Sequence, residues 1–317
     1  MTGSGRILFI FLDGVGIGEA DPDRNPFTRA VIPTLLNLMG GRLPTLGRPE
    51  SRGADGRSFP LDATLGTKGL PQSGTGQAAL LTGANAARLH GRHFGPWTPV
   101  SLRPLVEERS VLRAALDHGR SVLFANAYPR GWPGPGPRGS RRVAGPPLAA
   151  WGAGLLDRHE EALADGRAVS SEIVNDGWRR HLGHARLPEV TETEAGRNLG
   201  HITREAELTL FAHYGTDTAG HRGGMEGGVA ALERVDRFLA GVLEAAPDDT
   251  TLLLASDHGN LEDVSAGHTL NPALGVASGP GAADLARRVR SILDVAPACL
   301  RHLGLTDHPG APPRPPS

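Results

Sequence analysis

The 317-residue sequence contains one cysteine, Cys299, and one lysine, Lys68. A single thiol can form neither an internal disulfide nor a thiolate metal site, which excludes a disulfide-stabilised secreted scaffold and a zinc finger. Any metal must therefore be bound by histidine and carboxylate side chains. The 33 Lys and Arg residues balance 34 Asp and Glu residues to a formal charge of -1, which argues against nucleic-acid binding through charge alone.

Long apolar runs are also missing. No segment approaches the roughly 18 apolar residues of a membrane span, and the run Ile7–Leu12 ends at Asp13, before it reaches the length of about 7 to 15 residues of a signal peptide. We therefore expect a soluble, cytoplasmic protein with no membrane partner. With 39% hydrophobic residues, 44 glycines and 26 prolines, the composition is that of a folded globule.

Three short apolar runs, at residues 7–12, 208–216 and 250–256, end directly before Asp13, Asp217 and Asp257. Their polar positions do not alternate strictly with apolar ones, which is typical of strands covered on both faces in a parallel sheet. Because ligands bind outside the carboxyl ends of such strands, the three carboxylates are expected to converge.

Helical periodicity separates the predicted strands. It is clear in Met225–Ala245 and Ala283–Leu293, and a helix that starts near Val111 and stops at Gly119 precedes a fourth candidate strand, Ser121–Ala127. This alternation predicts an α/β fold with a mostly parallel central sheet sandwiched by helices.

The segment Pro129–Pro147 is rich in proline and glycine and predicts a boundary. Helix-like stretches follow at about 148–165 and 170–182. We expect residues 1–128 and 191–308 to form the core, residues 129–190 a small cap or insertion, and residues 309–317 a disordered tail.

Three short motifs carry residues that can bind metal. Asp217 and His221 are four residues apart, which places them on one side of a helix, although the same spacing is common on solvated helix faces. Asp257 and His258 can reach one ion only if the chain turns after the strand, as Gly259 allows. His268 lies in a loop, where a lone histidine is usually a surface residue.

A fourth motif, PQSGTGQ at residues 71–77, is a glycine-containing loop that runs into a predicted helix. Such a loop directs backbone N–H groups at an anion, and Ser73 would lie where a phosphate binds. The alternative is that Ser73 is simply an N-cap residue.

Taken together, these motifs resemble the alkaline phosphatase superfamily. The segments LDGVGIGEADPDRNPF, PQSGTGQ, TDTAGH and SDHGNLEDVSAGHTLNP occur in the order of its metalloenzyme branch, which holds cofactor-independent phosphoglycerate mutase and phosphopentomutase. The resemblance covers about residues 6–95 and 200–275. It implies a sheet sandwiched by helices and two divalent ions at the carboxyl edge of the sheet.

The resemblance also implies roles for individual residues. One ion would be bound by Asp217, His221 and His268, and the other by Asp13, Asp257 and His258. Ser73 matches the position of the nucleophile that forms a phosphoseryl intermediate. Histidine and carboxylate ligands suit Mn²⁺ and Zn²⁺ comparably, so the metal stays open between these two.

The expected activity is metal-dependent phosphoryl transfer on a small phosphorylated substrate, with hydrolysis of a phosphomonoester favoured. A short cap favours hydrolysis over a phosphomutase reaction. The alternatives are a phosphomutase of the phosphoglycerate or phosphopentose type, a phosphodiesterase or nucleotide pyrophosphatase, and an inactive metal-binding protein. A sulfatase is excluded because the sequence around Ser73 lacks the proline and arginine of that signature.

Substrate contacts are carried over with less support. The mutase has an acidic residue and then Val-Gly-His after its nucleophile, where this chain has Gly74, Thr75, Gly76 and Gln77. Gly74 and Thr75 beside the nucleophile, and Arg92 and His93 beyond the following helix, are the candidate substrate contacts, and arginine suits phosphate through its planar guanidinium. For Arg92 a solvated surface position is the favoured alternative. The sequence does not fix the oligomeric state.

Overall fold

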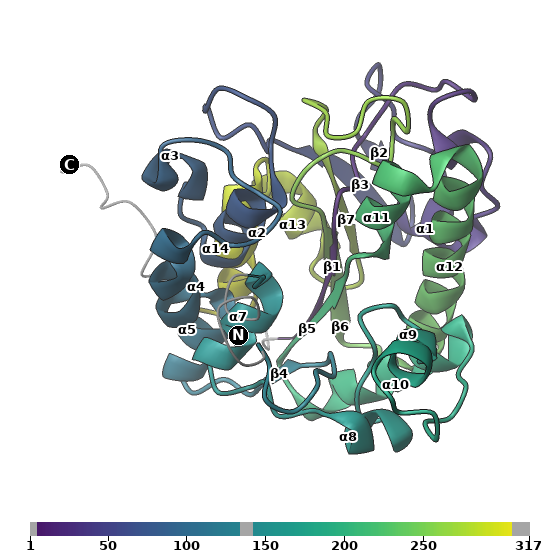
Figure 1. The fold of residues 1–317 in the computed structure, drawn as a ribbon. Helices are drawn as coiled ribbons and strands as arrows, with labels where there is room; N and C mark the ends of the chain where they lie inside the picture. Colours follow the sequence, from purple (N-terminus) through teal and green to yellow (C-terminus); the bar gives the residue numbers. More distant parts are fainter. Residues whose placement is uncertain (1–4, 134–141, 306–317) are drawn as a thin grey trace.

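A computed structural model, which describes residues 5–133 and 142–305, shows a seven-stranded sheet between two layers of helices (Figure 1). The strand order is β2-β3-β7-β6-β1-β5-β4. The strands are β1 (Arg6–Leu12), β2 (Ser51–Arg52), β3 (Gly56–Leu61), β4 (Val122–Phe124), β5 (Leu208–His213), β6 (Thr250–Ala255) and β7 (Ala273–Ser278). The four predicted strands are all present, as β1, β4, β5 and β6.

The centre of the sheet is parallel. β1 pairs in parallel with β5 on one side and β6 on the other, and β4 pairs in parallel with β5. β7 and β3 add antiparallel pairings at the other end of the sheet. Residues 7–12 of β1 are all buried, because helices cover both faces of the strand. The predicted α/β fold with a sandwiched, mostly parallel sheet is confirmed.

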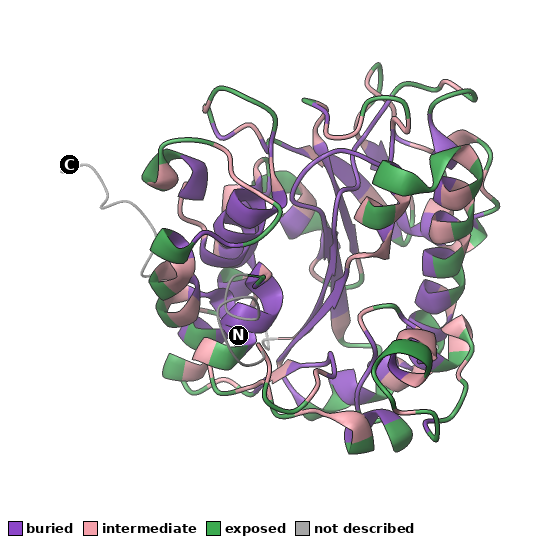
Figure 2. Cartoon of the chain, viewed as in Figure 1, coloured by how far each residue is buried: buried purple, intermediate pink, exposed green. Residues whose placement is uncertain are grey.

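One helical layer covers one face of the sheet, and its buried surfaces turn toward the strands (Figure 2). Positions 7, 9 and 11 of β1 cluster with this layer. Its buried side chains form one hydrophobic cluster with these positions, so the layer is part of the main core. The helices of this layer are α2 (Ser73–Thr82), α3 (Ala86–His90), α4 (Arg103–Arg109), α5 (Val111–Asp117), α7 (Gly145–Gly152), α13 (Ala282–Arg288) and α14 (Val295–His302).

The second layer packs against positions 8, 10 and 12 of β1. It contains α1 (Pro33–Leu38), α10 (Glu192–Ile202), α11 (Gly215–Arg222) and the long helix α12 (Gly224–Ala245). The apolar stripe predicted for Met225–Ala245 is buried at Leu232, Val235, Leu239 and Val242, as periodic spacing requires. Short 3-10 helices complete the chain at η1 (Pro26–Thr28), η2 (Val100–Leu102), η3 (Thr203–Glu205) and η4 (Ile292–Asp294).

The prediction of a helix over Ala283–Leu293 is wrong at its C-terminal end. α13 stops at Arg288, and Val289 adopts an extended conformation that buries its side chain. Ser291 then caps η4, with the side chain of Asp294 accepting a hydrogen bond in return. A capping box starts a new helical turn, so the apolar spacing continues across a break in the backbone.

Residues 142–190, within the segment expected to be a cap, contain α7, α8 (Glu160–Ala164) and α9 (Asp176–His181). α7 packs against α2 and α4, and its residue Leu148 belongs to the main hydrophobic cluster. α8 and α9 contribute to a separate small cluster around Trp178. The division into core and cap stays a prediction.

Within residues 5–133 and 142–305, none of the helices combines the length and the apolar character that a membrane crossing requires. The expected disordered tail at 309–317 lies outside the described residues.

Candidate metal centre

Three neighbouring parallel strands end at one edge of the sheet, and candidate ligands follow each of them. Asp13 directly follows β1, while Asp257 and His258 follow β6 after one serine. Asp217 lies in the first turn of α11, just beyond the end of β5. Because β1 pairs with both β5 and β6, residues from distant parts of the chain meet at this edge.

The surface group consists of Asp217, His221 and His268, whose ligand atoms all lie within 4.8 Å of one another. His221 lies one turn after Asp217 on α11, with its Nε2 3.5 Å from Asp217 Oδ1. His268 Nε2 lies 3.0 Å from His221 Nε2 and 3.7 Å from Asp217 Oδ1. The His221 side chain is 41% exposed, so solvent reaches this group.

A backbone carbonyl sets the tautomer of His268. Its Nδ1 lies 2.7 Å from the carbonyl oxygen of Pro71, and since a carbonyl only accepts, Nδ1–H donates and Nε2 keeps its lone pair. Burial and the nearby charge of His258 lower the pKa of His268 to about 4. A metal binds to a neutral imidazole through its free lone pair. The lone pair on His268 Nε2 faces the two other ligand atoms of the surface group.

The buried group consists of Asp13, Asp257 and His258, whose ligand atoms also lie within 4.8 Å of one another. Asp257 and His258 are 0% exposed and Asp13 is 6% exposed. His258 Nε2 lies 3.4 Å from Asp13 Oδ1 and 3.6 Å from Asp257 Oδ2. Its Nδ1 lies 3.2 Å from the carbonyl oxygen of Gly259, so Nδ1–H donates there and Nε2 faces the carboxylates.

The electrostatics of the buried group call for a cation. Burial raises the pKa of Asp13 and raises that of Asp257 well above its usual value, with the Asp13 charge adding to the second shift. Burial alone would lower the pKa of His258, but the carboxylates of Asp257 and Asp13 outweigh it and raise the pKa to about 10. Without a metal, a proton on His258 therefore supplies the positive charge.

Two carboxylate oxygens of the buried group, Asp13 Oδ1 and Asp257 Oδ2, have no hydrogen-bond partner in the part of the chain that the structure describes. Buried charge without a partner is strongly unfavourable, and a divalent ion would satisfy both oxygens. The donor set of each group, histidine nitrogen with carboxylate oxygen, suits a divalent metal. The residues present therefore fit metal ions at both groups.

Ser73 lies beside the buried group. It is the first residue of α2, and the N-cap position belongs to Gln72, which has extended dihedral angles. The alternative interpretation of Ser73 as an N-cap residue is therefore wrong. Its hydroxyl Oγ lies 2.9 Å from His258 Nε2, and its side chain is almost fully buried.

Side-chain amides and one carboxylate support the two groups, and sequence reasoning did not assign them. Gln77 donates from Nε2 to Asp13 Oδ2 at 3.0 Å, and Asn260 donates from Nδ2 to Asp217 Oδ1 at 2.7 Å. Glu262 is buried and accepts from the backbone N–H of Asn260 at 2.8 Å, which holds the loop after β6. Their positions in the sequence could have identified them. Gln77 lies one helical turn after Ser73, and Asn260 and Glu262 lie within the SDHGNLED motif.

Two cavities meet at Ser73. One of about 930 Å³ is lined by Ser73 together with the surface-group residues and by Trp97 and Arg222. The other, of about 400 Å³, is lined by Ser73, Asp13 and the aromatic residues Trp97, Tyr128 and Trp132, among others. Ser73 thus lines both cavities, although its side chain is almost fully buried.

Comparison with known sequences places this chain near phosphoglycerate mutases. The family model described as Metalloenzyme superfamily matches residues 188–307. The 2,3-bisphosphoglycerate-independent phosphoglycerate mutase of Desulforudis audaxviator (strain MP104C) is 32% identical over 130 residues, which are 38% of this chain and 26% of that protein. The same enzyme of Synechococcus sp. (strain JA-2-3B'a(2-13)) is 36% identical over 33% of this chain and 23% of that protein. The chain thus matches only about a quarter of the length of these curated relatives.

Solved structures share the fold over nearly the whole chain. A protein from Pyrococcus horikoshii has a TM-score of 0.58 at 13% identity, with 98% of this chain and 100% of that chain covered. The alkaline phosphatase from the Antarctic bacterium TAB5 has a TM-score of 0.51 at 11% identity, with 95% and 98% covered. The lipoteichoic acid synthase LtaP from Listeria monocytogenes has a TM-score of 0.53 at 8% identity, with 96% and 72% covered.

Residues 188–307 are thus similar to the Metalloenzyme superfamily, and the chain as a whole shares the fold of an alkaline phosphatase. The resemblance predicted from the four motifs is confirmed. The preference for hydrolysis over isomerisation gains nothing from these relatives, because the curated ones carry the name of a mutase.

The four candidate substrate contacts do not line the two cavities at Ser73. A Cβ on Gly74 would lie 2.1 Å from the carbonyl oxygen of Trp97, and the Thr75 hydroxyl accepts from the backbone N–H of Phe94 at 3.1 Å. His93 Nε2 lies 3.1 Å from the carbonyl oxygen of Thr64. Arg92 stacks over the ring of Phe94. The contacts of Gly74 and Thr75 join the loop after α3 to the start of α2, while His93 joins that loop to Thr64.

Proposed function

We propose that this chain transfers a phosphoryl group from a small phosphorylated metabolite to water, with Ser73 as the nucleophile. The position of Ser73 Oγ, 2.9 Å from His258 Nε2 in the buried group, is the observation that supports this most directly. The same side chain lines a cavity with the whole surface group. A hydroxyl beside one potential cation site, on a cavity shared with a second, is an arrangement suited to phosphoryl transfer.

The buried group and the surface group would each hold one divalent ion. Such ions, when bound, lower the pKa of a nearby hydroxyl and offset the negative charge on the phosphoryl oxygens. Gln77 and Asn260 orient Asp13 and Asp217, and the carbonyls of Pro71 and Gly259 fix the histidine tautomers. Mn²⁺ and Zn²⁺ fit these ligands comparably.

The reaction has two steps at phosphorus. Ser73 loses its hydroxyl proton to solvent and attacks, so that an Oγ–P bond forms while the bond from phosphorus to the ester oxygen breaks. The leaving group departs with that electron pair and takes a proton from solvent. A water molecule then attacks the phosphoserine, which releases inorganic phosphate and restores the Ser73 hydroxyl. The N-terminus of the ten-residue helix α2 adds a favourable dipole beside the phosphoryl group.

A phosphomutase is the second candidate, and the name of the curated relatives favours it. In that case a second hydroxyl of the same substrate, rather than water, would accept the phosphoryl group from Ser73. The two outcomes share the first step and differ only in the acceptor.

Phosphorus NMR on purified protein with Mn²⁺ or Zn²⁺ separates these candidates. We expect free phosphate from an aryl phosphate and from a panel of sugar phosphates, and a phosphoserine at position 73 after acid quenching. Ser73→Ala should lower kcat by about 1,000-fold or more, while Ser101→Ala, at an exposed serine, should leave it unchanged. Unchanged activity of Ser73→Ala would refute the nucleophile, and isomerised product without free phosphate would establish the mutase.

A further inference from the structure

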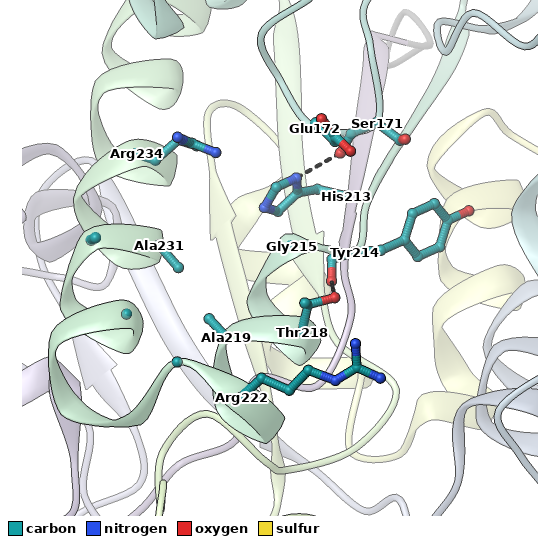
Figure 3. A pocket seen from close by; sticks show the side chains of 13 residues that line it. Ser171, Glu172, His213, Tyr214, Gly215, Thr218, Ala219, Arg222, Ala231 and Arg234 are labelled. Carbon is teal, nitrogen blue, oxygen red and sulfur yellow. Dashed lines mark hydrogen bonds between the residues drawn. The ribbon is translucent and has the colours of Figure 1, made fainter. Parts of the chain in front are cut away.

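A third cavity, of about 560 Å³, lies beside the metal centre and contains no member of the buried or surface group (Figure 3). It is bounded by the end of β5, by α11 and α12, and by the segment at Ser171 and Glu172. Thr218 lines this cavity as well as both cavities at Ser73. The third cavity therefore adjoins the candidate active site through α11.

His213 offers this cavity an unused hydrogen-bond acceptor. Its side chain is buried, and Nδ1 lies 2.7 Å from the carbonyl oxygen of Ser171, so Nδ1–H donates and the neutral ring keeps its lone pair on Nε2. Burial lowers the pKa of His213 to about 4, with the charge of Arg234 adding to the shift. Nε2 is buried and has no hydrogen-bond partner among residues 5–133 and 142–305. Such a group is costly unless a ligand or water donates to it.

Two arginines supply positive charge to the cavity. Arg234 extends from α12 toward the His213 ring in Figure 3, and its one ion pair among the described residues is a long one, 3.7 Å to Glu192. Arg222, at the end of α11, has no ion pair within residues 5–133 and 142–305. Glu172 is the one acidic residue among the lining residues. In Figure 3 it lies on the opposite side of the His213 ring from Ala219 and Ala231.

Small residues leave room between these polar groups. Gly215 lies against the His213 ring, where an added Cβ would come within 2.9 Å of Nε2. The floor of the cavity is made by Ala219, Gly223, Gly227, Ala230 and Ala231. Larger side chains at these positions would fill the space that a ligand needs.

We infer that this cavity binds a small organic anion that carries a free hydroxyl group. The hydroxyl donates to His213 Nε2, and the anionic group lies against Arg234. This binding goes beyond the proposed phosphoryl transfer and needs neither Ser73 nor a metal ion. Because α11 carries both Asp217 and His221, a bound anion also stiffens the helix that presents the surface group.

Malate and succinate form a matched pair of probes, since malate carries one hydroxyl that succinate lacks. We expect calorimetry on the purified protein to show malate binding, with succinate about tenfold weaker because it leaves Nε2 without a donor. Ala231→Met, which fills the cavity, should weaken malate binding at least tenfold. Ala240→Met, at another half-buried alanine of α12 outside the cavity, is the control and should bind normally.

Two further variants make the test decisive. His213→Phe should remove the preference for malate over succinate, provided that its circular dichroism matches the wild type. Ser73→Ala should bind malate as the wild type does, which separates this site from the proposed catalytic activity. Equal affinities for malate and succinate, undiminished binding in Ala231→Met, or no malate binding at millimolar concentration would each overturn the inference.

Discussion

The buried group and the surface group use the same donor types but sit in different surroundings. Every member of the buried group is at most 6% exposed, and two of its carboxylate oxygens have no hydrogen-bond partner among the described residues. In the surface group Asp217 Oδ1 accepts from Asn260, and His221 is open to solvent. Burial should therefore make one site dependent on its cation, while water can replace a ligand at the other.

The largest expected difference concerns the carboxylate ligands themselves. Asp257→Asn should lower the rate on an aryl phosphate by more than about 100-fold and remove one metal ion per chain, because loss of a ligand should exceed the 10- to 100-fold cost of losing a supporting residue. Asp217→Asn should cost less, because solvent can occupy the vacated position. Atomic emission on desalted protein, together with the assay, measures both. A larger loss in Asp217→Asn would reverse the comparison.

Variants of the two supporting amide residues should show the same order, with the larger loss of activity at the buried group, but smaller losses than the aspartate variants. Gln77→Ala leaves Asp13 Oδ2 and the backbone N–H of Gly145 without their partners, and should lower activity by about 10- to 100-fold. Asn260→Ala affects the more exposed group and should lie at the low end of that range. Metal titration of each variant shows which site is weakened. Equal effects of the two variants would mean that burial does not control the sites.

Metal removal should distinguish the two groups by the rate at which each releases its ion and by the effect of that release on stability. A chelator should draw an ion from the surface group first, and release from the buried group should then lower the melting temperature. A ligand at about 1,000 times its Kd stabilises a fold by about 4 kcal/mol, which sets the scale of the second effect. Asp217→Asn should lose only the fast phase. Biphasic release that persists in this variant would contradict the assignment.

The last effect is a pH dependence of the metal-free protein. His258 has a pKa of about 10 in the fold, above its unfolded value of 6.5, so its contribution is full below pH 6.5 and is lost as pH rises toward 10. His268, with a pKa of about 4, has the opposite sign and costs stability as pH falls below 6.5. Each proton changes the unfolding free energy by about 1.4 kcal/mol per pH unit.

Urea unfolding of chelated protein between pH 5 and 10 measures these slopes. Metal-loaded protein is the control and should lose the alkaline slope, because the cation replaces the proton on His258. A metal-free protein that is equally stable at pH 6.5 and pH 10 would show that the buried group does not retain that proton.

Sequence patterns predicted the strands and the long helix because their signals are local. Runs such as Ile7–Leu12 are apolar without alternation, and α12 has an apolar stripe at helical spacing. β7 was not predicted, because its sequence ALGVAS is short and poor in residues that favour strands. Gly275 is needed there, since a Cβ would meet the ring of Phe59 at 2.4 Å. That contact joins β7 to β3, and the sequence of neither strand predicts it by itself.

The amino-acid sequence by itself determined which side chains follow which strands, because the residue after a strand is a matter of chain order. Only the tertiary structure decided that β5, β1 and β6 are neighbours, and this pairing brings the two triads together. The same holds for the acceptor on His213, whose free nitrogen depends on the distant carbonyl of Ser171. Burial and hydrogen bonding between remote segments set these properties, and no local pattern encodes them.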